Sequence, residues 1–155
     1  MSNTPGVGDQ APDFEAESTA GIVRLSDTLG HKLVLYFYPK DNTPGCTTET
    51  QDFRDLHEIF RQYDCYVAGV SRDSLRSHEN FSAKLNLPFA LIADPEEKLC
   101  NLYDVMRDKK MYGKAVRGIE RSTFLIDANG KIAGVWRGLK VPGHAQAVLE
   151  AVKTL

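Results

Sequence analysis

The stretch LVLYFYPKDNTPGCTTETQDFRDLHEIFRQY, from Leu33 to Tyr63, changes its periodicity midway. Its first six residues, LVLYFY, show no polar alternation, which predicts a strand buried on both faces of a sheet. After the turn residues, Phe53, Leu56, Phe60 and Tyr63 recur at spacings of three and four with charges between them. This spacing predicts an amphipathic helix. A buried strand that leads directly into such a helix is typical of an α/β protein.

The remainder of the chain continues this alternation of strands and helices. The predicted elements are, in order, the strand 65–71, a helix marked by Leu75, Phe81 and Leu85, the strand 89–94, a helix opened by Pro95 and carrying Leu99, Leu102 and Tyr103, the hairpin strands 122–127 and 131–138 around the turn ANG, and a last helix through Ala147 and Val152. The order β-α-β-α-β-α-β-β-α implies a central mixed sheet with helices on both faces. A thioredoxin-like arrangement satisfies that order.

Length and charge limit the class of protein. The chain has 155 residues, 42% of them hydrophobic and 26% charged, which suits a single globular domain over 1–155. A net charge of -2 gives no electrostatic reason to expect nucleic acid or a membrane surface as a partner. The basic run RDKK at 107–110 is predicted to be a solvated loop, and residues 1–13 are expected to wrap the surface. Without a signal peptide or a membrane span, a cytoplasmic protein is expected.

The cysteines and histidines show no metal or cofactor pattern. Cys46, Cys65 and Cys100 are too widely spaced for a C-x-x-C pair or a zinc knuckle, and reduced thiols are expected in the cytosol. Cys65 begins an apolar strand and is predicted to be core, while Cys100 is predicted to be packed or half-buried. No haem or nucleotide motif is present, so no cofactor is expected. The four histidines are predicted to be surface residues: His31, His57, His78 and His144.

Cys46 differs from the other two cysteines in its position. It lies beyond the carboxyl end of the first buried strand, where sites form in open α/β sheets. Thr43 can cap a helix whose first residue is Pro44, while a competing assignment uses Thr48 and Gln51 as a capping box. The first is preferred because it explains Pro44. Either places the sulfur near backbone N–H groups at a helix N-terminus, where the thiolate is favoured.

The segment PKDNTPGCTTE, from Pro39 to Glu49, resembles the active-site signature of peroxiredoxins. Together, YFYPKDNTPGCTTE and the later GIERSTFLID are similar to the bacterioferritin comigratory protein branch, also called peroxiredoxin Q. The resemblance runs from GDQAPDF near the start to the final helix. It implies a thioredoxin-like fold extended at the N-terminus, and an enzyme that reduces hydrogen peroxide and organic hydroperoxides.

The resemblance also implies roles for four residues, and Glu49, one helical turn after Cys46, is a candidate to orient one of them. Cys46 would be the peroxidatic cysteine, with Pro39, Thr43 and Arg121 completing the site. The Thr43 hydroxyl is expected to accept from the peroxide and donate toward the sulfur. The Arg121 guanidinium would stabilise the thiolate and the transition state, with Glu49 orienting it. The ring of Pro39 would shield the site from water.

The positions of a second, resolving cysteine are occupied by other residues. Many proteins of the branch that this chain resembles carry it five residues after the peroxidatic cysteine, where this chain has Gln51. A second subgroup, which this chain resembles more closely, carries it on the following helix about thirty-six residues after, where this chain has Ser82. A one-cysteine enzyme reduced by thioredoxin, glutaredoxin or a small thiol is therefore expected, and it is expected to be a monomer. The alternative is that Cys100 resolves the sulfenic acid after local unfolding.

Two other classes of protein fit the fold. A binding or chaperone module could keep the fold without turnover, but the set of Pro39, Thr43, Cys46 and Arg121 argues against it. A thiol-disulfide oxidoreductase would be expected to carry the missing C-x-x-C pair. Consumption of peroxide separates an enzyme from a binding module.

Overall fold

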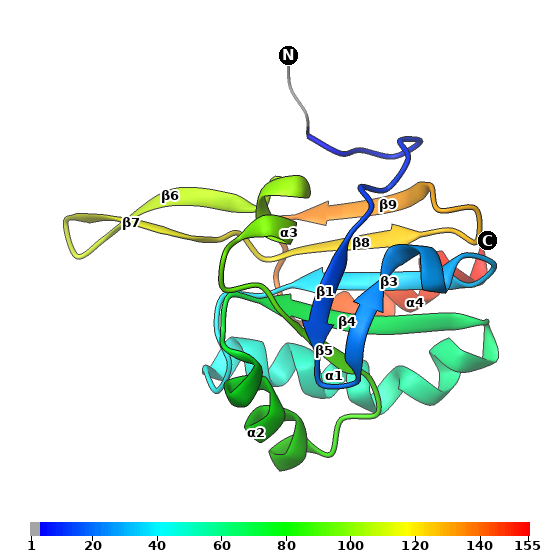
Figure 1. Cartoon of the computed structure of the whole chain (residues 1–155), viewed down its shortest axis with the longest axis horizontal. Coiled ribbons are helices and arrows are strands. Elements are labelled where there is room, and N and C mark those ends of the chain that lie inside the picture. The colour runs from blue at the N-terminus through cyan, green and yellow to red at the C-terminus, as the bar shows by residue number, and fades with distance from the viewer. Residues whose placement is uncertain (1–3) are drawn as a thin grey trace.

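The computed structural model describes residues 4–155, Met111 by its backbone alone, and its centre is a seven-stranded mixed sheet (Figure 1). In the order in which they lie across the sheet, the strands are β2 (Gly21–Arg24), β1 (Glu15–Ser18), β5 (Ala90–Ala93), β4 (Cys65–Ser71), β3 (Lys32–Phe37), β8 (Ser122–Ile126) and β9 (Ile132–Arg137). β3, β4 and β5 are parallel, whereas β8 and β9 are antiparallel to their neighbours. The predicted mixed sheet is confirmed.

Helices cover both faces of this sheet. One face packs against α1 (Pro44–Gln62), α2 (Leu75–Leu85) and α4 (His144–Lys153), and α1 and α4 lie behind the strands in Figure 1. The opposite face packs against α3 (Lys98–Leu102) and the segment that precedes β1. A short 3₁₀ turn, η1 (Leu25–Thr28), leads from β2 toward β3.

β3 lies at the middle of this core. Residues 33–38 are all buried, because side chains on alternate positions of the strand enter the two opposite core clusters. β3 pairs with β4 on one side and with β8 on the other, in a register that sets Phe37 beside both Val70 and Ser122. The carboxyl ends of β3 and β4 therefore meet the start of β8 at one edge of the sheet.

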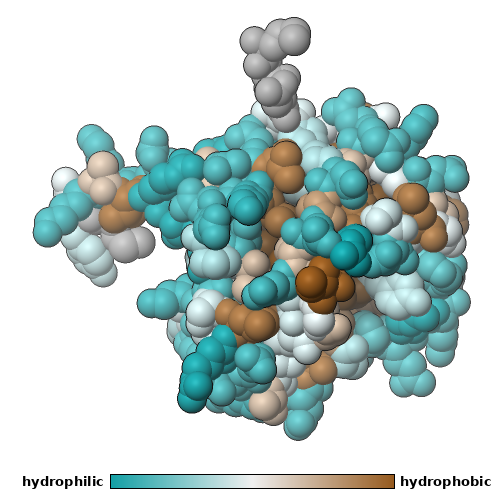
Figure 2. Space-filling model, viewed as in Figure 1, coloured by the Kyte–Doolittle hydropathy of each residue, from teal (hydrophilic) through white to brown (hydrophobic). Residues whose placement is uncertain are grey.

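The strands β6 (Met106–Met111) and β7 (Lys114–Ile119) correct the sequence-based expectation of a loop at 107–110. They form a separate two-stranded sheet that projects from the body, and its surface is mostly hydrophilic in Figure 2. Tyr112 and Gly113 both have positive φ, as a two-residue hairpin turn requires. Because lysines and arginines interrupt these two segments, they lack the regular apolar alternation by which strands are recognised in a sequence.

The N-terminal segment was expected to wrap the surface. Among its described residues, Gly8 N–H donates to Ile132 O at 2.8 Å and Ala11 N–H to Gly130 O at 2.9 Å, so the segment runs beside the start of β9. Residues 1–3 of the expected segment lie outside the described residues. β1, which the sequence did not predict, continues this segment and pairs with β2. Within residues 4–155, no helix has the length and apolar character needed to cross a membrane.

Candidate active site

The start of α1 positions the Cys46 sulfur. α1 begins at Pro44 with Thr43 at the N-cap position, so the preferred helix start is confirmed and the capping box of Thr48 and Gln51 is wrong. The Thr43 side chain makes no capping hydrogen bond to the helix, so its expected capping bond is absent. Cys46 is the third helical residue, close to the unpaired N–H groups and the positive end of a 19-residue helix. Its side chain enters the core cluster between the sheet and α1, and the residue is only 1% exposed.

Arg121 joins Cys46 and Glu49 in one hydrogen-bonded group. Its Nη2 donates to Cys46 Sγ at 3.3 Å, and its Nη1 donates to Glu49 Oε1 at 2.7 Å. Arg121 reaches this place because it immediately precedes β8, whose first residue pairs with the end of β3. A Cβ atom on Gly45 would lie 3.3 Å from Nη2, so glycine leaves the guanidinium room beside the helix start.

Burial and neighbouring charges shift the pKa values of Arg121 and Glu49 in this group. Burial alone would lower the pKa of Arg121, but the neighbouring Glu49 and Cys46 raise it, so its charge is permanent. Burial raises the pKa of Glu49 to about 7 despite the nearby arginine, and Asp52 adds to the effect. Glu49 Oε2 has no hydrogen-bond partner among the described residues. The group therefore holds a fixed cation against the sulfur and a carboxyl that titrates near neutral pH.

Thr43 and Pro39 lie on the loop between β3 and Cys46, and neither is hydrogen-bonded to the sulfur. The Thr43 hydroxyl donates to Lys40 O at 2.8 Å, instead of donating toward Cys46 as the sequence analysis expected. Its oxygen lone pairs remain able to accept a hydrogen bond. Pro39, half-buried, directly follows β3 and begins the loop that leads to Thr43.

The other two cysteines are buried away from this group, as predicted for Cys65 and Cys100. Burial raises the pKa of the Cys65 thiol to about 12, and it raises the pKa of Cys100 further, helped by Asp94. Cys100 belongs to the core cluster on one face of the sheet, whereas Cys46 belongs to the cluster on the other face. The sheet itself therefore separates these two sulfurs.

Two histidines that were predicted to lie on the surface are buried, so that prediction was wrong for His78 and His144, which are 0% and 5% exposed. His78 shares the inner face of α2 with Phe81 and Leu85, at spacings of three and four that the sequence contains. His144 begins α4 and its Nε2 lies 2.8 Å from Thr123 Oγ1. The sequence analysis missed that a histidine spaced three or four residues from apolar residues lies on the buried face of a helix.

Acid should weaken the fold through His144. Burial, with the charge of Arg121, lowers its pKa to about 4, whereas an unfolded chain protonates histidine near about 6.5. Below that value the unfolded state binds more protons, so the stability contributed by neutral His144 is present above about pH 6.5 and lost as pH falls toward 4. The loss should approach roughly 3 kcal/mol, since each pKa unit corresponds to about 1.4 kcal/mol.

Denaturant titrations of the chain at several pH values between 7.5 and 4.5 measure this loss. In His144→Gln the stability should fall less steeply over that range, whereas His31→Gln, at a half-exposed histidine paired with Asp64, should keep the original slope. Equal slopes in all three proteins would contradict the assignment.

Known proteins resemble this chain over most of its length. The model of the AhpC/TSA family matches residues 7–135. Peroxiredoxin Bcp of Bacillus subtilis is 50% identical over 150 residues, which cover 96% of each chain. Peroxiredoxin Bcp of Xanthomonas campestris is 55% identical over 124 residues, 80% of this chain and 78% of that one.

Solved structures agree with these relatives. A structure of the Xanthomonas campestris bacterioferritin comigratory protein, described for its alkyl peroxide reduction activity, has a TM-score of 0.89 at 47% identity and covers 97% of this chain and 96% of that one. A cysteine-to-serine variant of Xylella fastidiosa PrxQ has a TM-score of 0.92 at 44% identity, with the same coverage. The predicted thioredoxin-like fold is confirmed by this similarity.

Proposed function

Because the chain belongs to the AhpC/TSA family, as a peroxiredoxin of the Bcp branch, we propose that Cys46 is the residue with which this peroxidase reduces hydroperoxides. The observation that carries the proposal is the 3.3 Å hydrogen bond from Arg121 Nη2 to Cys46 Sγ at the N-terminus of α1. A cation and a helix N-terminus beside a sulfur both favour the thiolate, which is the nucleophilic form.

The oxidation step transfers one oxygen atom. The Cys46 thiolate attacks the nearer peroxide oxygen, the O–O bond breaks, and the second oxygen leaves with the bonding electrons as hydroxide or alkoxide. Cys46 becomes a sulfenic acid, and the leaving group takes a proton from solvent to become water or an alcohol. Arg121 stabilises the negative charge as it moves from the sulfur to the leaving oxygen.

The neighbouring side chains prepare this step. Glu49 holds one arm of the Arg121 guanidinium by a 2.7 Å charge-assisted bond, which leaves the other arm directed at the sulfur. The Thr43 hydroxyl donates its hydrogen bond to Lys40 O, so toward the peroxide its oxygen acts as an acceptor. Pro39, which has no N–H group, helps to limit the access of water.

The return step uses an external thiol. An attacking thiol displaces water from the sulfenic acid to give a mixed disulfide, and a second thiol releases the Cys46 thiol and leaves with the first as a disulfide. The chain has Gln51 and Ser82 at the two positions where the resemblance implies a resolving cysteine. Cys100 lies in the core cluster on the other face of the sheet from Cys46. This position disfavours a disulfide between Cys46 and Cys100.

A peroxide-consumption assay tests the proposed reaction. Hydrogen peroxide and an alkyl hydroperoxide are each offered with thioredoxin, glutaredoxin or a small thiol as the electron source. The alkyl substrate is included because the Xanthomonas campestris relative was described for alkyl peroxide reduction. Turnover with at least one thiol is expected, and no turnover with any of them would contradict the proposal.

Replacing Ser82 by cysteine should convert the cycle to one with an internal disulfide. Ser82 is half-buried on α2, which packs on the same face of the sheet as Cys46. A disulfide needs the two Cα atoms within about 7 Å, so we expect local opening of α1 and α2 to precede it. After one equivalent of peroxide, Ser82→Cys should lose two hydrogens without keeping oxygen, and peptide mapping should link positions 46 and 82. A link to Cys100 instead would show that Cys100 resolves.

Three further expectations stay predictions: the single domain over 1–155, the monomeric state and the cytoplasmic location.

A further inference from the structure

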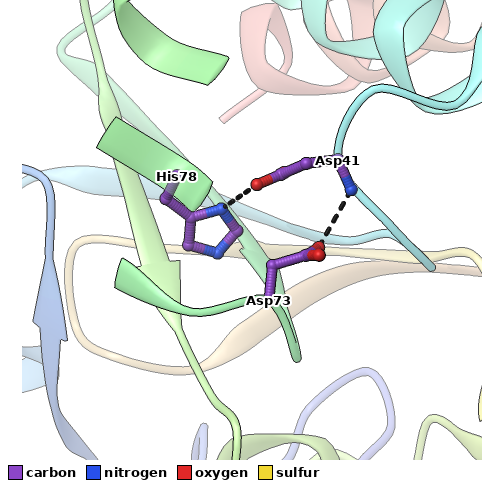
Figure 3. A group of neighbouring side chains, drawn as sticks. All are labelled: Asp41, Asp73 and His78. Atoms are coloured by element: carbon purple, nitrogen blue, oxygen red, sulfur yellow. Dashed lines mark hydrogen bonds and ion pairs between the residues drawn. The ribbon is translucent and has the colours of Figure 1, made fainter. Parts of the chain in front are cut away.

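Three segments far apart in the sequence meet beneath the loop that leads to Cys46. The β3–α1 loop contributes Asp41, the β4–α2 loop contributes Asp73, and the first turns of α2 contribute His78 (Figure 3). Their potential ligand atoms lie within 4.8 Å of one another. The side chains of Asp41 and His78 are 1% and 0% exposed, so both are removed from water.

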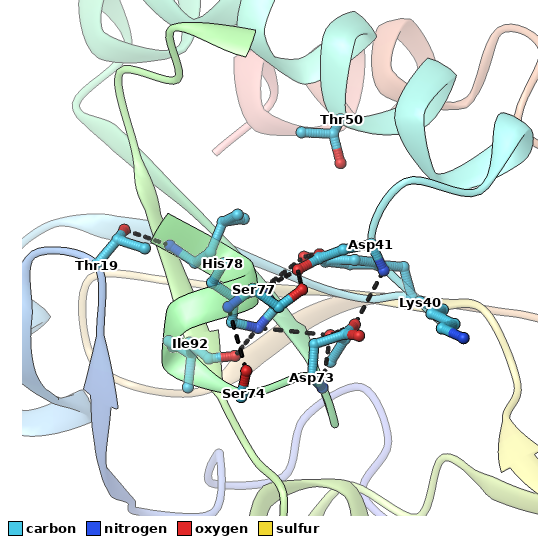
Figure 4. Close-up of polar contacts among 12 residues, drawn as sticks. Thr19, Lys40, Asp41, Thr50, Asp73, Ser74, Ser77, His78 and Ile92 are labelled. Atoms are coloured by element: carbon cyan, nitrogen blue, oxygen red, sulfur yellow. Dashed lines mark hydrogen bonds and ion pairs between the residues drawn. The ribbon is translucent and has the colours of Figure 1, made fainter. Parts of the chain in front are cut away.

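The bonds of His78 define its charge. Nδ1 lies 2.8 Å from Asp41 Oδ2, and Nε2 lies 3.0 Å from Ile92 O (Figure 4). A carbonyl and a carboxylate both accept, so both ring nitrogens donate and His78 is an imidazolium. With both nitrogens donating to protein oxygens, His78 has no lone pair for a metal ion, and the three residues form a hydrogen-bonded cluster.

Asp41 carries the matching negative charge. Tyr38 OH donates to its Oδ1 at 2.7 Å and Ser77 Oγ to its Oδ2 at 2.8 Å, in addition to the bond from His78. Burial alone would raise the pKa of Asp41, but these hydrogen bonds and the charge of His78 lower it. The two residues thus form an ion pair within the core, where removing one partner is costly.

This pair fixes the backbone that precedes Cys46. Asp41 N–H donates to Asp73 Oδ2 at 2.9 Å, which attaches the main chain of the loop as well as its side chain. Asn42 follows in the left-handed region, with φ of 63°, and turns the chain toward the N-cap Thr43. The position of the helix start, and therefore of the sulfur, depends on these attachments.

The reaction cycle needs this loop in two states. Hydrogen peroxide is small, and its reduction requires the closed group of Cys46, Arg121 and Glu49. A protein thiol must approach the sulfur itself, and Cys46, at 1% exposed, offers it almost no accessible surface in this closed arrangement. An element that holds the loop on α2 therefore favours the oxidation step and opposes the return step.

We propose that Asp41 and His78 are a positioning pair that holds the Cys46 loop closed on α2, and that separating them opens the site to thiol reductants. The inference rests on the proposed function, because it concerns the two halves of that cycle. Neither residue is hydrogen-bonded to the sulfur or to Arg121, and the pair acts through the loop.

The two half-reactions test the pair in opposite directions. In Asp41→Asn and in His78→Gln, oxidation of Cys46 by hydrogen peroxide should slow by about 100-fold, as expected when reacting groups are misplaced. Reduction of the preformed sulfenic acid by thioredoxin should become about tenfold faster, because loss of one buried partner favours the open loop. Both rates are measured in single-turnover experiments on the full chain, and the unsubstituted chain in the same series tests the proposed function separately.

Matched controls come from an exposed pair of the same chemistry. His31 Nδ1 lies 2.7 Å from Asp64 Oδ1, with both side chains about half exposed, so His31→Gln and Asp64→Asn should change either rate by less than about twofold. In the double variant Asp41→Asn with His78→Gln, oxidation of Cys46 should be no slower than in the slower of the two single variants, because neither buried charge remains without its partner. Half-reactions that change together, or not at all, would overturn the proposal.

A measurement on the unsubstituted chain covers the case in which the variants do not fold. Nitrogen NMR of the His78 ring should show both nitrogens protonated at neutral pH. A neutral ring with one protonated nitrogen would overturn the charged pair.

Discussion

Cys46→Ser should lose peroxide reduction by at least about 1,000-fold, as expected when a nucleophile is removed, while the protein stays folded. Serine replaces one atom, and its hydroxyl is not ionised at neutral pH, so Arg121 has no anion to stabilise. The loss is measured by peroxide consumption with a thiol in excess, and folding by circular dichroism and a denaturant titration.

The control for this variant is Cys65→Ser, which makes the same replacement at another buried thiol. Cys65 lies at the start of β4, while Cys46 follows the end of β3, so the two lie at opposite ends of parallel strands. Cys65→Ser should cost stability and keep peroxide reduction. Full activity in Cys46→Ser would remove Cys46 from the reaction.

Arg121→Met should raise the apparent pKa of the Cys46 thiol and slow its oxidation by about 100-fold, the effect of losing one donor aimed at developing charge. Methionine keeps the unbranched stem but provides no cation at 3.3 Å from the sulfur. Less thiolate is present at neutral pH, so raising the pH should restore part of the rate. The part of the oxidation rate that high pH does not restore measures the transition-state stabilisation that Arg121 provides.

Alkylation of Cys46 across the pH range gives the apparent pKa, and stopped-flow oxidation gives the rate. Arg117→Met is the matched control, because Arg117 lies on β7 and bonds to Glu97 and Asn101 in an exposed position. That variant should leave both quantities unchanged. Unchanged values in Arg121→Met would remove Arg121 from the site.

The parallel core was predictable from the sequence, because strands buried on both faces give continuous apolar runs. LVLYFY and CYVAGVS correspond to β3 and β4, and the spacing of Phe53 and Phe60 corresponds to α1. Tyr63 was expected on the apolar face, but it caps the helix and is exposed. Leu102, similarly, ends α3 with its side chain exposed. Periodicity predicts elements well and their ends poorly, since end residues leave the packed face.

The polar strands were not predictable by the same reasoning. Six of the twelve residues of β6 and β7 are charged, and the two strands pair only with each other. Of their described side chains, Met106 and Ile119 at the base of the hairpin enter the core. β1 has four residues, EAES, with two exposed glutamates. Neither segment has the apolar pattern by which a strand is recognised.

The candidate site was predictable only in part. The resemblance assigned Cys46 and Arg121 to one site, and helical spacing added Glu49. The structure places the three within hydrogen-bonding distance although Arg121 is 75 residues from Cys46. The pair of Asp41 and His78 was not foreseen. Its two members are 37 residues apart, and a histidine on a helix gives no sign of its partner until the fold is known.

Intact mass of the chain after one equivalent of hydrogen peroxide, with and without added thiol, shows which cysteine is oxidised and how it is reduced. Without thiol the protein should gain one oxygen atom, located on Cys46 by peptide mapping, and with a small thiol it should form a mixed disulfide at Cys46. A loss of two hydrogens, with a disulfide between Cys46 and Cys100, would contradict the one-cysteine cycle. Oxygen found on Cys65 or Cys100 while Cys46 stays reduced would contradict the assignment of the peroxidatic residue.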